Sequence, residues 1–368
     1  MSSPLSSPAA PASPPPSSSA ADIPTHESLL PSDTLVKREF VTVARGPERK
    51  APGHRIYYEL HGQDGLDASH TRVVLIMGLS NSLAAWHNQF PFLPSQPGYS
   101  VLVLDNRGVG YSGAPAHALS ASLTRYRTSE MARDVVEVLE YLGWVKEGEE
   151  ERRLNVVGIS MGGMIAQELA LLLPTQTRTL LLTSTRTGSR RFPPDLPSLK
   201  ATKMFLKQTA GLAKTPEAQM GLIVDVLYPT GYLEEEVEAD GSRRRKRREV
   251  LEEEFLYRYK KGRRQPLAGR VGQTAAVLAH HLSPARLALL AASIPRIAII
   301  HGEEDELIHV ERAREMHRDL PGSSLRLIPS AGHALPSQIR DEYNEWLRKN
   351  IDRPVRGESG YVEEGGAA

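Results

Sequence analysis

The chain has 368 residues, and its 45 basic and 44 acidic side chains leave a net charge of +1, so no overall field favours nucleic acid, a membrane surface or an acidic partner. The absence of cysteine excludes disulfides, thiolate catalysis and zinc–thiolate sites. A hydrophobic content of 40% is sufficient for a substantial core. No apolar run approaches the ~18 to 20 residues of a membrane span, and no secretory signal or Arg-rich transit peptide is evident, so we expect a cytoplasmic protein.

The N-terminal third of the sequence begins with a segment of low complexity and continues with strands. Residues 1–34 are dominated by Ser, Pro and Ala, which predicts a disordered tail, with Pro-rich docking as the alternative. Residues 35–44 and 54–60 read as two strands around a Gly/Pro-rich turn. Short apolar runs at 72–77 and 100–104 predict buried strands.

Strands and helices then alternate along the chain. Residues 126–144 place apolar side chains at helical spacing, residues 154–159 form a buried strand, and residues 178–183 form another after an intervening helix. This alternation is typical of a mostly parallel sheet with helices on both faces.

The turn between strand 154–159 and the next helix carries the pattern Gly158-Xaa-Ser160-Xaa-Gly162. In a nucleophile elbow, a sharp strand-to-helix turn exposes one hydroxyl above the sheet, and small residues on either side relieve the crowding. The N-terminus of the following helix directs free amides and its positive dipole end toward that hydroxyl. The three fixed positions alone are a weak signal, so the chain must also supply an acid and then a histidine.

Between residues 185 and 293 the alternation stops, and the sequence predicts an inserted helical cap with no obvious strand. Acidic runs at 234–238 and 252–254 bracket a basic run at 243–248. A basic run of this kind is found in nuclear localisation and nucleic-acid-binding segments. Because the acidic runs nearly neutralise it, we favour a solvated, salt-bridged part of the cap with pairs at i,i+4 spacing.

The strand pattern resumes at residues 294–300, and a further strand is expected at 324–328. Helices are expected at 310–320 and 339–351. We therefore expect a tail at 1–34, a core made of 35–184 and 294–351, a cap at 185–293 and a flexible C-terminal tail at 352–368.

A serine hydroxyl needs a base within hydrogen-bond reach and a third group that orients the base. His333 follows the last strand, at the sheet edge where the elbow also opens, which makes it the candidate base. Glu303, Glu304 and Asp305 follow the preceding strand, and the residues alone do not separate these three acids. Other histidines have less specific positions in helices, at a strand end or in loops: His54, His87, His117, His280, His281 and His301.

Six ordered motifs resemble those of the α/β-hydrolase superfamily across about residues 35–351, apart from the cap. They are His61-Gly62, Met77-Gly78-Leu79 with Trp86, the Asp-Xaa-Arg-Gly-Xaa-Gly-Xaa-Ser run from Asp105 to Ser112, the elbow at Ser160, Gly302-Xaa-Xaa-Asp305 and Gly332-His333. The resemblance implies a mostly parallel, eight-stranded sheet with helices on both faces and an inserted helical cap.

The resemblance also implies a catalytic triad of Ser160, Asp305 and His333, with an oxyanion hole formed by the backbone N–H groups of Leu79 and Met161. Many members of the superfamily have His-Gly where this chain has Met77-Gly78, which changes the polarity near the hole but not its backbone donors. The run around Arg107 is a scaffold in such proteins. No metal or cofactor is implied. Trp86 and Met164 lie close to the oxyanion loop or the elbow in the sequence and are candidate substrate-binding residues.

These features together predict a serine hydrolase that cleaves a small or medium acyl ester or thioester through an acyl-enzyme. Hydrolysis of an amide, lactone or carbon–carbon bond and acyl transfer remain open, as does a non-catalytic binding protein on the same fold. A serine at the elbow argues against the epoxide hydrolases and haloalkane dehalogenases that resemble this fold, which use an aspartate there. The expected partner is a small acyl substrate; the oligomeric state is left open.

Overall fold

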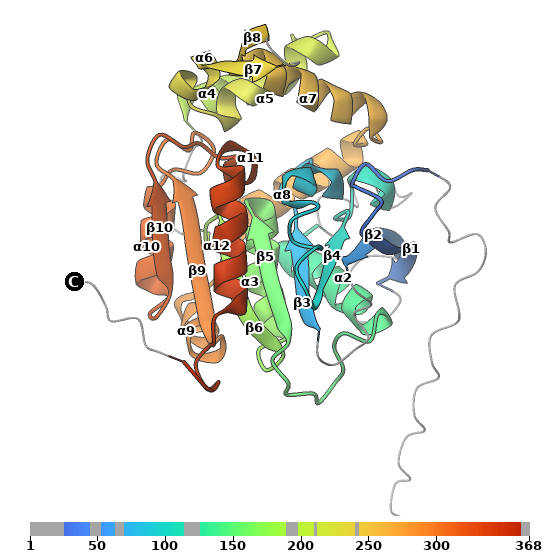
Figure 1. Cartoon of the computed structure of the whole chain (residues 1–368), viewed down its shortest axis with the longest axis vertical. Helices are drawn as coiled ribbons and strands as arrows, with labels where there is room; N and C mark the ends of the chain where they lie inside the picture. Colours follow the sequence, from blue (N-terminus) through green and yellow to red (C-terminus); the bar gives the residue numbers. More distant parts are fainter. Residues whose placement is uncertain are drawn as a thin grey trace, which may run out of the picture.

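The computed structural model of the protein describes residues 26–44, 53–62, 70–113, 126–188, 198–209, 212–239 and 243–361. A central sheet lies between two layers of helices, and a separate group of helices lies across one end of the sheet (Figure 1).

The sheet has eight strands in the order β1-β2-β4-β3-β5-β6-β9-β10. Strand β2 is antiparallel to both of its neighbours, and the other pairs are parallel. The strands are β1 (Leu35–Val43), β2 (His54–Gly62), β3 (Thr71–Ile76), β4 (Tyr99–Leu104), β5 (Leu154–Ile159), β6 (Thr177–Thr183), β9 (Arg296–Gly302) and β10 (Ser324–Ile328). This arrangement confirms the predicted fold class.

The central strands are largely apolar because helices cover both of their faces. Alternate side chains enter opposite cores: Val74 and Ile76 of β3 pack into one cluster, and Val73 and Leu75 into the other. All four are fully buried. A continuous apolar run, rather than an alternating one, is therefore the expected sequence signal for these strands.

The helices of the core divide between the two faces. One cluster contains buried side chains of α2, α3, α9 and α10, and the other contains those of η2, α11 and α12. The elements are η2 (Leu83–Gln89), η3 (Gly110–Ser112), α2 (Thr128–Tyr141), α3 (Met161–Leu172), α9 (Pro284–Ser293), α10 (Glu311–Asp319), α11 (Leu335–Gln338) and α12 (Arg340–Asp352).

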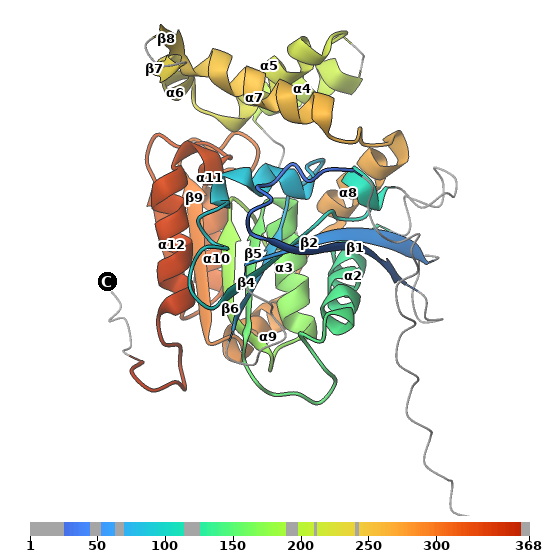
Figure 2. The ribbon, with the colours of Figure 1, turned by 45° about the vertical axis from the view of Figure 1, so that its right-hand side comes forward.

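The cap lies across the end of the sheet in both ribbon views (Figures 1 and 2). Its elements are α4 (Leu199–Thr209), α5 (Pro216–Leu227), α6 (Thr230–Glu234), β7 (Glu236–Ala239), β8 (Arg243–Lys246), α7 (Arg247–Lys261) and α8 (Leu267–Ala279). Helices α5, α6 and α7 pack together through Val224, Leu233 and Leu251, with Tyr228 from the end of α5.

The expectation that the cap has no strand is wrong, because β7 and β8 form an antiparallel hairpin. The charge runs explain it: Glu236 lies opposite Lys246 and Glu238 opposite Arg244, and opposite charges across strands stabilise the pair. The predicted i,i+4 pairing also occurs, with Arg245 Nε 3.1 Å from a carboxylate oxygen of Glu249. The charge runs are therefore paired with each other, partly across strands and partly along α7.

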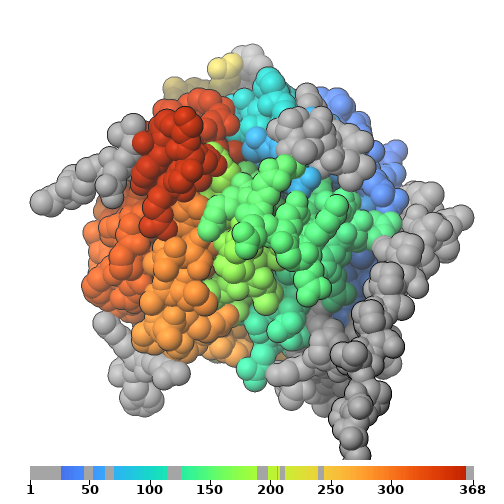
Figure 3. Space-filling model, turned by 90° about the horizontal axis from the view of Figure 1, so that it is seen from below, coloured from blue at the N-terminus to red at the C-terminus, as the bar shows by residue number. Residues whose placement is uncertain are grey.

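Helix α9 belongs to the core and not to the cap, which corrects the expected boundary at residue 293. Leu287 and Leu290 are buried in the same cluster as α3, and Arg286 pairs with Glu168 of α3 at 2.6 Å. Seen from below (Figure 3), the orange segment of the chain that contains α9 lies beside the green core segments. An apolar helix face shows that a helix packs, but not on which surface.

Ordered chain also extends beyond both expected limits of the core. Ser28 donates a hydrogen bond of 2.7 Å to the buried carboxylate of Glu59. Near the other end, Arg178 pairs with Glu358 at 2.7 Å. Residues 26–34 and 353–361 thus contact the core instead of forming tails; residues 1–25 and 362–368 lie outside the described chain.

Within the described residues, no single helix is long and apolar enough to cross a membrane. In the described part of the chain, α8 and α9 meet the required length and composition as a pair, but they are bent by 92° relative to each other.

Candidate active site

Ser160 occupies the turn between β5 and α3 with a backbone φ of +56°, in the left-handed region that a residue with a side chain rarely adopts. The flanking glycines make this turn possible. A Cβ at Gly158 would lie 2.4 Å from the carbonyl oxygen of Gly162, and one at Gly162 would lie 2.0 Å from that of Ile76. The strain at Ser160 is therefore held by tight packing of α3 against β3, as in a nucleophile elbow.

The loop after β3 passes close to the Ser160 side chain. A Cβ at Gly78 would lie 3.1 Å from Ser160 Cβ and 3.6 Å from its hydroxyl oxygen. Leu79 follows in this loop. Met161 begins α3, so its amide is among the first four of the helix that have no acceptor within the helix. Both predicted oxyanion donors thus come from the segments that surround the hydroxyl.

The ends of four parallel strands are tied together at this edge of the sheet. The Ser160 amide donates to the carbonyl of Thr183 at the end of β6, and the Ser184 amide donates to Ile300 in β9, both at 3.0 Å. The Glu303 amide donates to Ile328, the last residue of β10, also at 3.0 Å. Ser160, the acidic run and the final loop therefore lie along one edge, which faces the cap (Figure 2).

Asp305 and His333 are in direct contact. Nδ1 of His333 lies 2.7 Å from Oδ2 of Asp305, and Oδ1 of the same carboxylate accepts the amides of Leu307 and Ile308 at 2.9 Å. Burial alone would raise the pKa of Asp305, but the neighbouring His333 and the hydrogen bonds from His301 and His333 hold that pKa well below its usual range. Asp305 is thus an ionised, buried acceptor.

The contact also orients the imidazole. Because a carboxylate can only accept, Nδ1 of His333 carries the proton, and Nε2 is left with a lone pair that can accept another. Glu303 and Glu304 are both exposed, so of the three candidate acids only Asp305 is placed to orient His333.

His301 supports the acid and was not singled out from the sequence. Its side chain is fully buried, with Nε2 2.8 Å from the carbonyl of Ile308 and 3.2 Å from Oδ2 of Asp305. A carbonyl only accepts, so Nε2 carries the proton and faces the carboxylate. The signal available in the sequence was the i,i+4 spacing of His301 and Asp305 across the end of a strand.

The loop that carries His333 is fixed by the cap. The His333 amide donates to the carbonyl of Leu227, the last residue of α5, at 2.9 Å. A Cβ at Gly332 would lie 2.5 Å from that same carbonyl oxygen. The cap therefore helps to position the candidate base, in addition to covering it.

The run around Arg107 is a scaffold in the structure. The Arg107 guanidinium makes two hydrogen bonds of 2.6 Å to Asp134, and both side chains are buried. Asp105 accepts the amides of Leu83 and Tyr111 at 2.8 Å, while burial raises its pKa to about 7. These contacts join η2, η3 and α2 beneath the loop after β3.

The two residues predicted to bind substrate are enclosed by packing. Trp86 is fully buried in one core cluster together with Met77, and Met164 is 1% exposed in the first turn of α3. Substrate binding by either side chain stays a prediction. The carbonyl of Met77 accepts from the Asn106 side chain at 2.8 Å.

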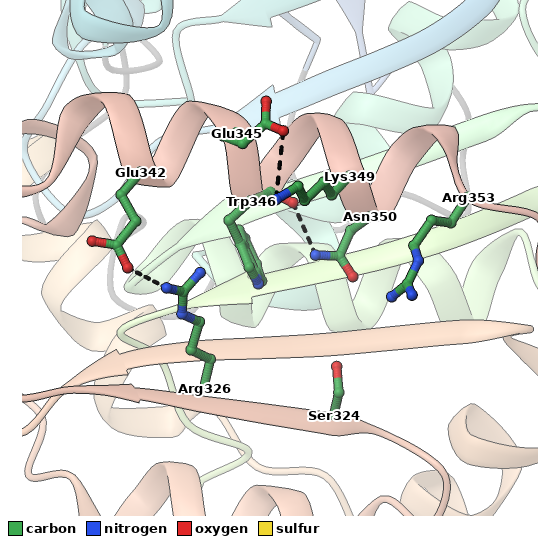
Figure 4. A pocket seen from close by; sticks show the side chains of 8 residues that line it. All are labelled: Ser324, Arg326, Glu342, Glu345, Trp346, Lys349, Asn350 and Arg353. Atoms are coloured by element: carbon green, nitrogen blue, oxygen red, sulfur yellow. Dashed lines mark hydrogen bonds and ion pairs between the residues drawn. The ribbon is translucent and has the colours of Figure 1, made fainter. Parts of the chain in front are cut away.

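Among the described residues, no group of three or more His, Asp or Glu side chains could hold a metal ion. A groove of about 360 Å³ lies between β10 and α12 on the flank of the sheet (Figure 4). Its charged residues are paired with each other, Arg326 with Glu342 and Lys349 with Glu345. This groove is not at the edge of the sheet that carries Ser160.

Comparisons with known proteins agree with this architecture. The family described as alpha/beta hydrolase fold matches residues 71–337. A putative carbamate hydrolase, RutD, of Stutzerimonas stutzeri is 26% identical over 300 residues, which cover 80% of this chain and 96% of the relative. The rhodomycin D methylesterase DauP of Streptomyces sp. is 27% identical over 282 residues, which cover 75% of this chain and 89% of the relative.

Solved structures show the same fold. A hydrolase from Pseudomonas aeruginosa aligns with a TM-score of 0.61 at 22% identity, covering 88% of this chain and 100% of its own. An esterase from Exiguobacterium antarcticum aligns with a TM-score of 0.59 at 20% identity, covering 85% of this chain and 98% of its own. The family model matches most of the chain, and the eight-stranded sheet has the corresponding architecture. This chain therefore belongs to the α/β-hydrolase family and is a hydrolase of that fold.

Proposed function

We propose that the protein hydrolyses a small or medium acyl ester or thioester, with Ser160 as nucleophile, His333 as base and Asp305 as the residue that orients the base. The observation that carries the proposal is the 2.7 Å contact between Asp305 and His333 at the edge where Ser160 is held in a strained turn. These are the residue types and the chain order of an acyl-transfer triad.

The reaction follows from the protonation states. Nε2 of His333 takes the Ser160 proton as the serine oxygen bonds to the acyl carbon, and Asp305 stabilises the resulting imidazolium. The amides of Leu79 and Met161 stabilise the oxyanion. When the bond to the leaving group breaks, His333 returns the proton to the departing oxygen or sulfur. Water then attacks the acyl-enzyme by the same route and releases the acid and free Ser160.

The curated relatives support a carboxylic-acid derivative as substrate. One is named a methylesterase and another a putative carbamate hydrolase. A carbamate carbonyl can be attacked by the same serine, so carbamate esters are a second candidate class on this site. Lactone, amide and carbon–carbon bond hydrolysis and acyl transfer use the same groups and differ in the leaving group or acceptor.

The cap would set the substrate range. Leu307, next to the acid, packs against Val226 and Met204 of the cap, and Ser198 donates to the carbonyl of Glu306 at 3.1 Å. Substitutions in this contact should change the preferred acyl length more than the chemistry. Some apolar side chains of the cap are used for packing, since Val224 and Val226 are buried, while Leu278 is exposed.

Labelling with a fluorophosphonate probe tests the proposal. We expect the wild type to be labelled and Ser160→Ala to remain unlabelled. Ser324→Ala, on an exposed position of edge strand β10, is the matched control and should be labelled normally. Absence of labelling in wild type and control would favour a non-catalytic binding protein. A panel of p-nitrophenyl esters of graded chain length, a carbamate and a lactone then defines the substrate class.

A further inference from the structure

Helix α8, which the sequence placed in the cap, is docked on the core through two glycines. A Cβ at Gly269 would lie 2.0 Å from the carbonyl oxygen of Gly108, and a Cβ at Gly272 would lie 2.6 Å from the ring of Tyr126. The helix therefore approaches the core backbone more closely than any side chain would permit. It acts as a fixed support at the junction of cap and core (Figure 2).

The next residue, Gln273, has a fully buried side chain that bridges two loops of the core. Its Oε1 accepts the backbone amide of Ser80 at 2.9 Å, and its Nε2 donates to the carbonyl of Arg107 at 2.9 Å. The side chain of Gln265 also donates to Oε1, at 3.0 Å. The partners fix the orientation of the amide, since the Ser80 N–H can only donate and the Arg107 carbonyl can only accept.

One end of this bridge reaches the loop that supplies a proposed oxyanion donor. Ser80 follows Leu79 directly and has a backbone φ of +61°, a left-handed conformation that persists only when its surroundings hold it. The hydrogen bond from the Ser80 amide fixes the peptide group between Leu79 and Ser80. Because this group adjoins Leu79, it restricts the direction in which the Leu79 N–H can point.

The other end of the bridge is rigid. Arg107 is buried and makes two hydrogen bonds of 2.6 Å with Asp134 of α2. Gln273 therefore ties the oxyanion loop to a part of the core that is itself fixed by a buried ion pair.

We propose that Gln273 is a positioning residue for the oxyanion hole: by holding the Ser80 amide against the Arg107 loop, it orients the Leu79 N–H toward the developing oxyanion. This inference rests on the proposed serine hydrolase function. Gln273 does not touch substrate in this role; it acts through the backbone of the loop after β3.

The main test replaces Gln273 by a residue of similar length without hydrogen-bonding groups. We expect Gln273→Met to lower kcat on an activated ester by about 10-fold to 100-fold, less than the loss of a whole oxyanion donor, with KM changed by less than about 2-fold. Its affinity for a boronic acid, which forms a tetrahedral adduct on serine, should fall by a similar factor. If Gln273 only packed the cap, the substitution would change stability or KM, and the variant would bind the boronic acid as tightly as the wild type does.

Gln265→Met is the matched control, because Gln265 contacts Gln273 but not the loop, and its kcat should stay within about 2-fold of wild type. If Gln273→Met does not fold, Gln273→Asn, one methylene too short to reach both loops, must show the same loss of kcat and of boronic acid affinity. A folded variant with wild-type kcat and boronic acid affinity would overturn the inference while leaving the function intact. Wild-type protein without Ser160-dependent labelling would instead refute the proposed function.

Discussion

Asp305 uses both carboxylate oxygens, one on Nδ1 of His333 at 2.7 Å and the other on the amides of Leu307 and Ile308 at 2.9 Å. The second pair of bonds fixes the carboxylate independently of His333. A substitution at Asp305 can therefore remove the negative charge of this side chain while the side chain keeps its position.

Asp305→Asn should lower kcat by about 10³-fold to 10⁴-fold while the protein stays folded. The new side chain can keep its oxygen on the two amides, but its NH₂ then faces Nδ1 of His333 and selects the tautomer that cannot accept the serine proton. Steady-state kinetics on a p-nitrophenyl ester measure this effect. Glu304→Gln, at the exposed neighbour, is the control. A loss of less than 10-fold at Asp305 would contradict its assigned role.

His301 should support the acid through its contacts with the Ile308 carbonyl and Asp305. His301→Leu leaves this partly buried carbonyl without its donor, so we expect the free energy of unfolding to fall by about 1 kcal/mol. We expect kcat to fall by about 10-fold, because the Asp305 loop loses a constraint. Denaturant unfolding and kinetics of the same samples measure both. His317→Ala, at an exposed histidine of α10, should change neither, and equal effects in the two variants would argue against support by His301.

The elbow depends on the absence of a side chain at Gly162. In Gly162→Ala the new methyl group would meet the Ile76 carbonyl oxygen at 2.0 Å, so we expect a loss of about 3 kcal/mol in the free energy of unfolding and a large loss of activity. Gly231→Ala in α6 places its methyl group in open space, so stability should stay the same or rise by up to about 1 kcal/mol. Similar unfolding midpoints for the two variants would show that the elbow is less tightly packed than the structure indicates.

His280 should make stability depend on pH. Burial, with further contributions from Arg186, Arg286 and His281, lowers the pKa of His280 to about 3. The unfolded chain binds a proton at His280 below about pH 6.5, whereas the folded chain does so only near pH 3, so stability falls as the pH is lowered between these values. The loss attributable to His280 is on the order of 5 kcal/mol.

His280→Gln should remove this component. Denaturant unfolding of both proteins from pH 7 to pH 3 gives two profiles, and their difference should grow as the pH falls. Buried carboxylates contribute equally to both profiles and cancel in the difference. Parallel profiles would mean that His280 is not buried in its neutral form.

The fold was predictable because its signals are local and strong. The apolar runs of β3, β4 and β5 and the Gly-Xaa-Ser-Xaa-Gly turn depend on burial and on backbone sterics, and both leave a direct trace in the sequence. The choice of Asp305 over Glu303 and Glu304 did not have such a trace. It rested on resemblance, since the burial of Asp305 and its contact with His333, which separate the three acids, are seen only in the structure.

The features that were missed depend on tertiary packing. The apolar face of α9 gave no sign that it packs on α3 instead of the cap, and the charge runs at 234–254 are compatible with a helix as well as with the β7–β8 hairpin. Gln273 bonds to the backbone of Ser80 and Arg107, which are remote in sequence, and His301 bonds across the loop that follows its own strand. Each is a buried polar side chain whose hydrogen bonds become visible only in three dimensions.

The most direct test of the account is to identify the residue that carries the acyl group during turnover. The wild-type enzyme is mixed with an activated ester, quenched in acid within the first turnovers, digested and analysed by mass spectrometry. We predict that the peptide containing Ser160 gains the mass of one acyl group. In Asp305→Asn, the acylated Ser160 peptide should accumulate further if the substitution slows deacylation more than acylation. Turnover of the ester with the acyl group on another residue, or undiminished in Ser160→Ala, would contradict the account.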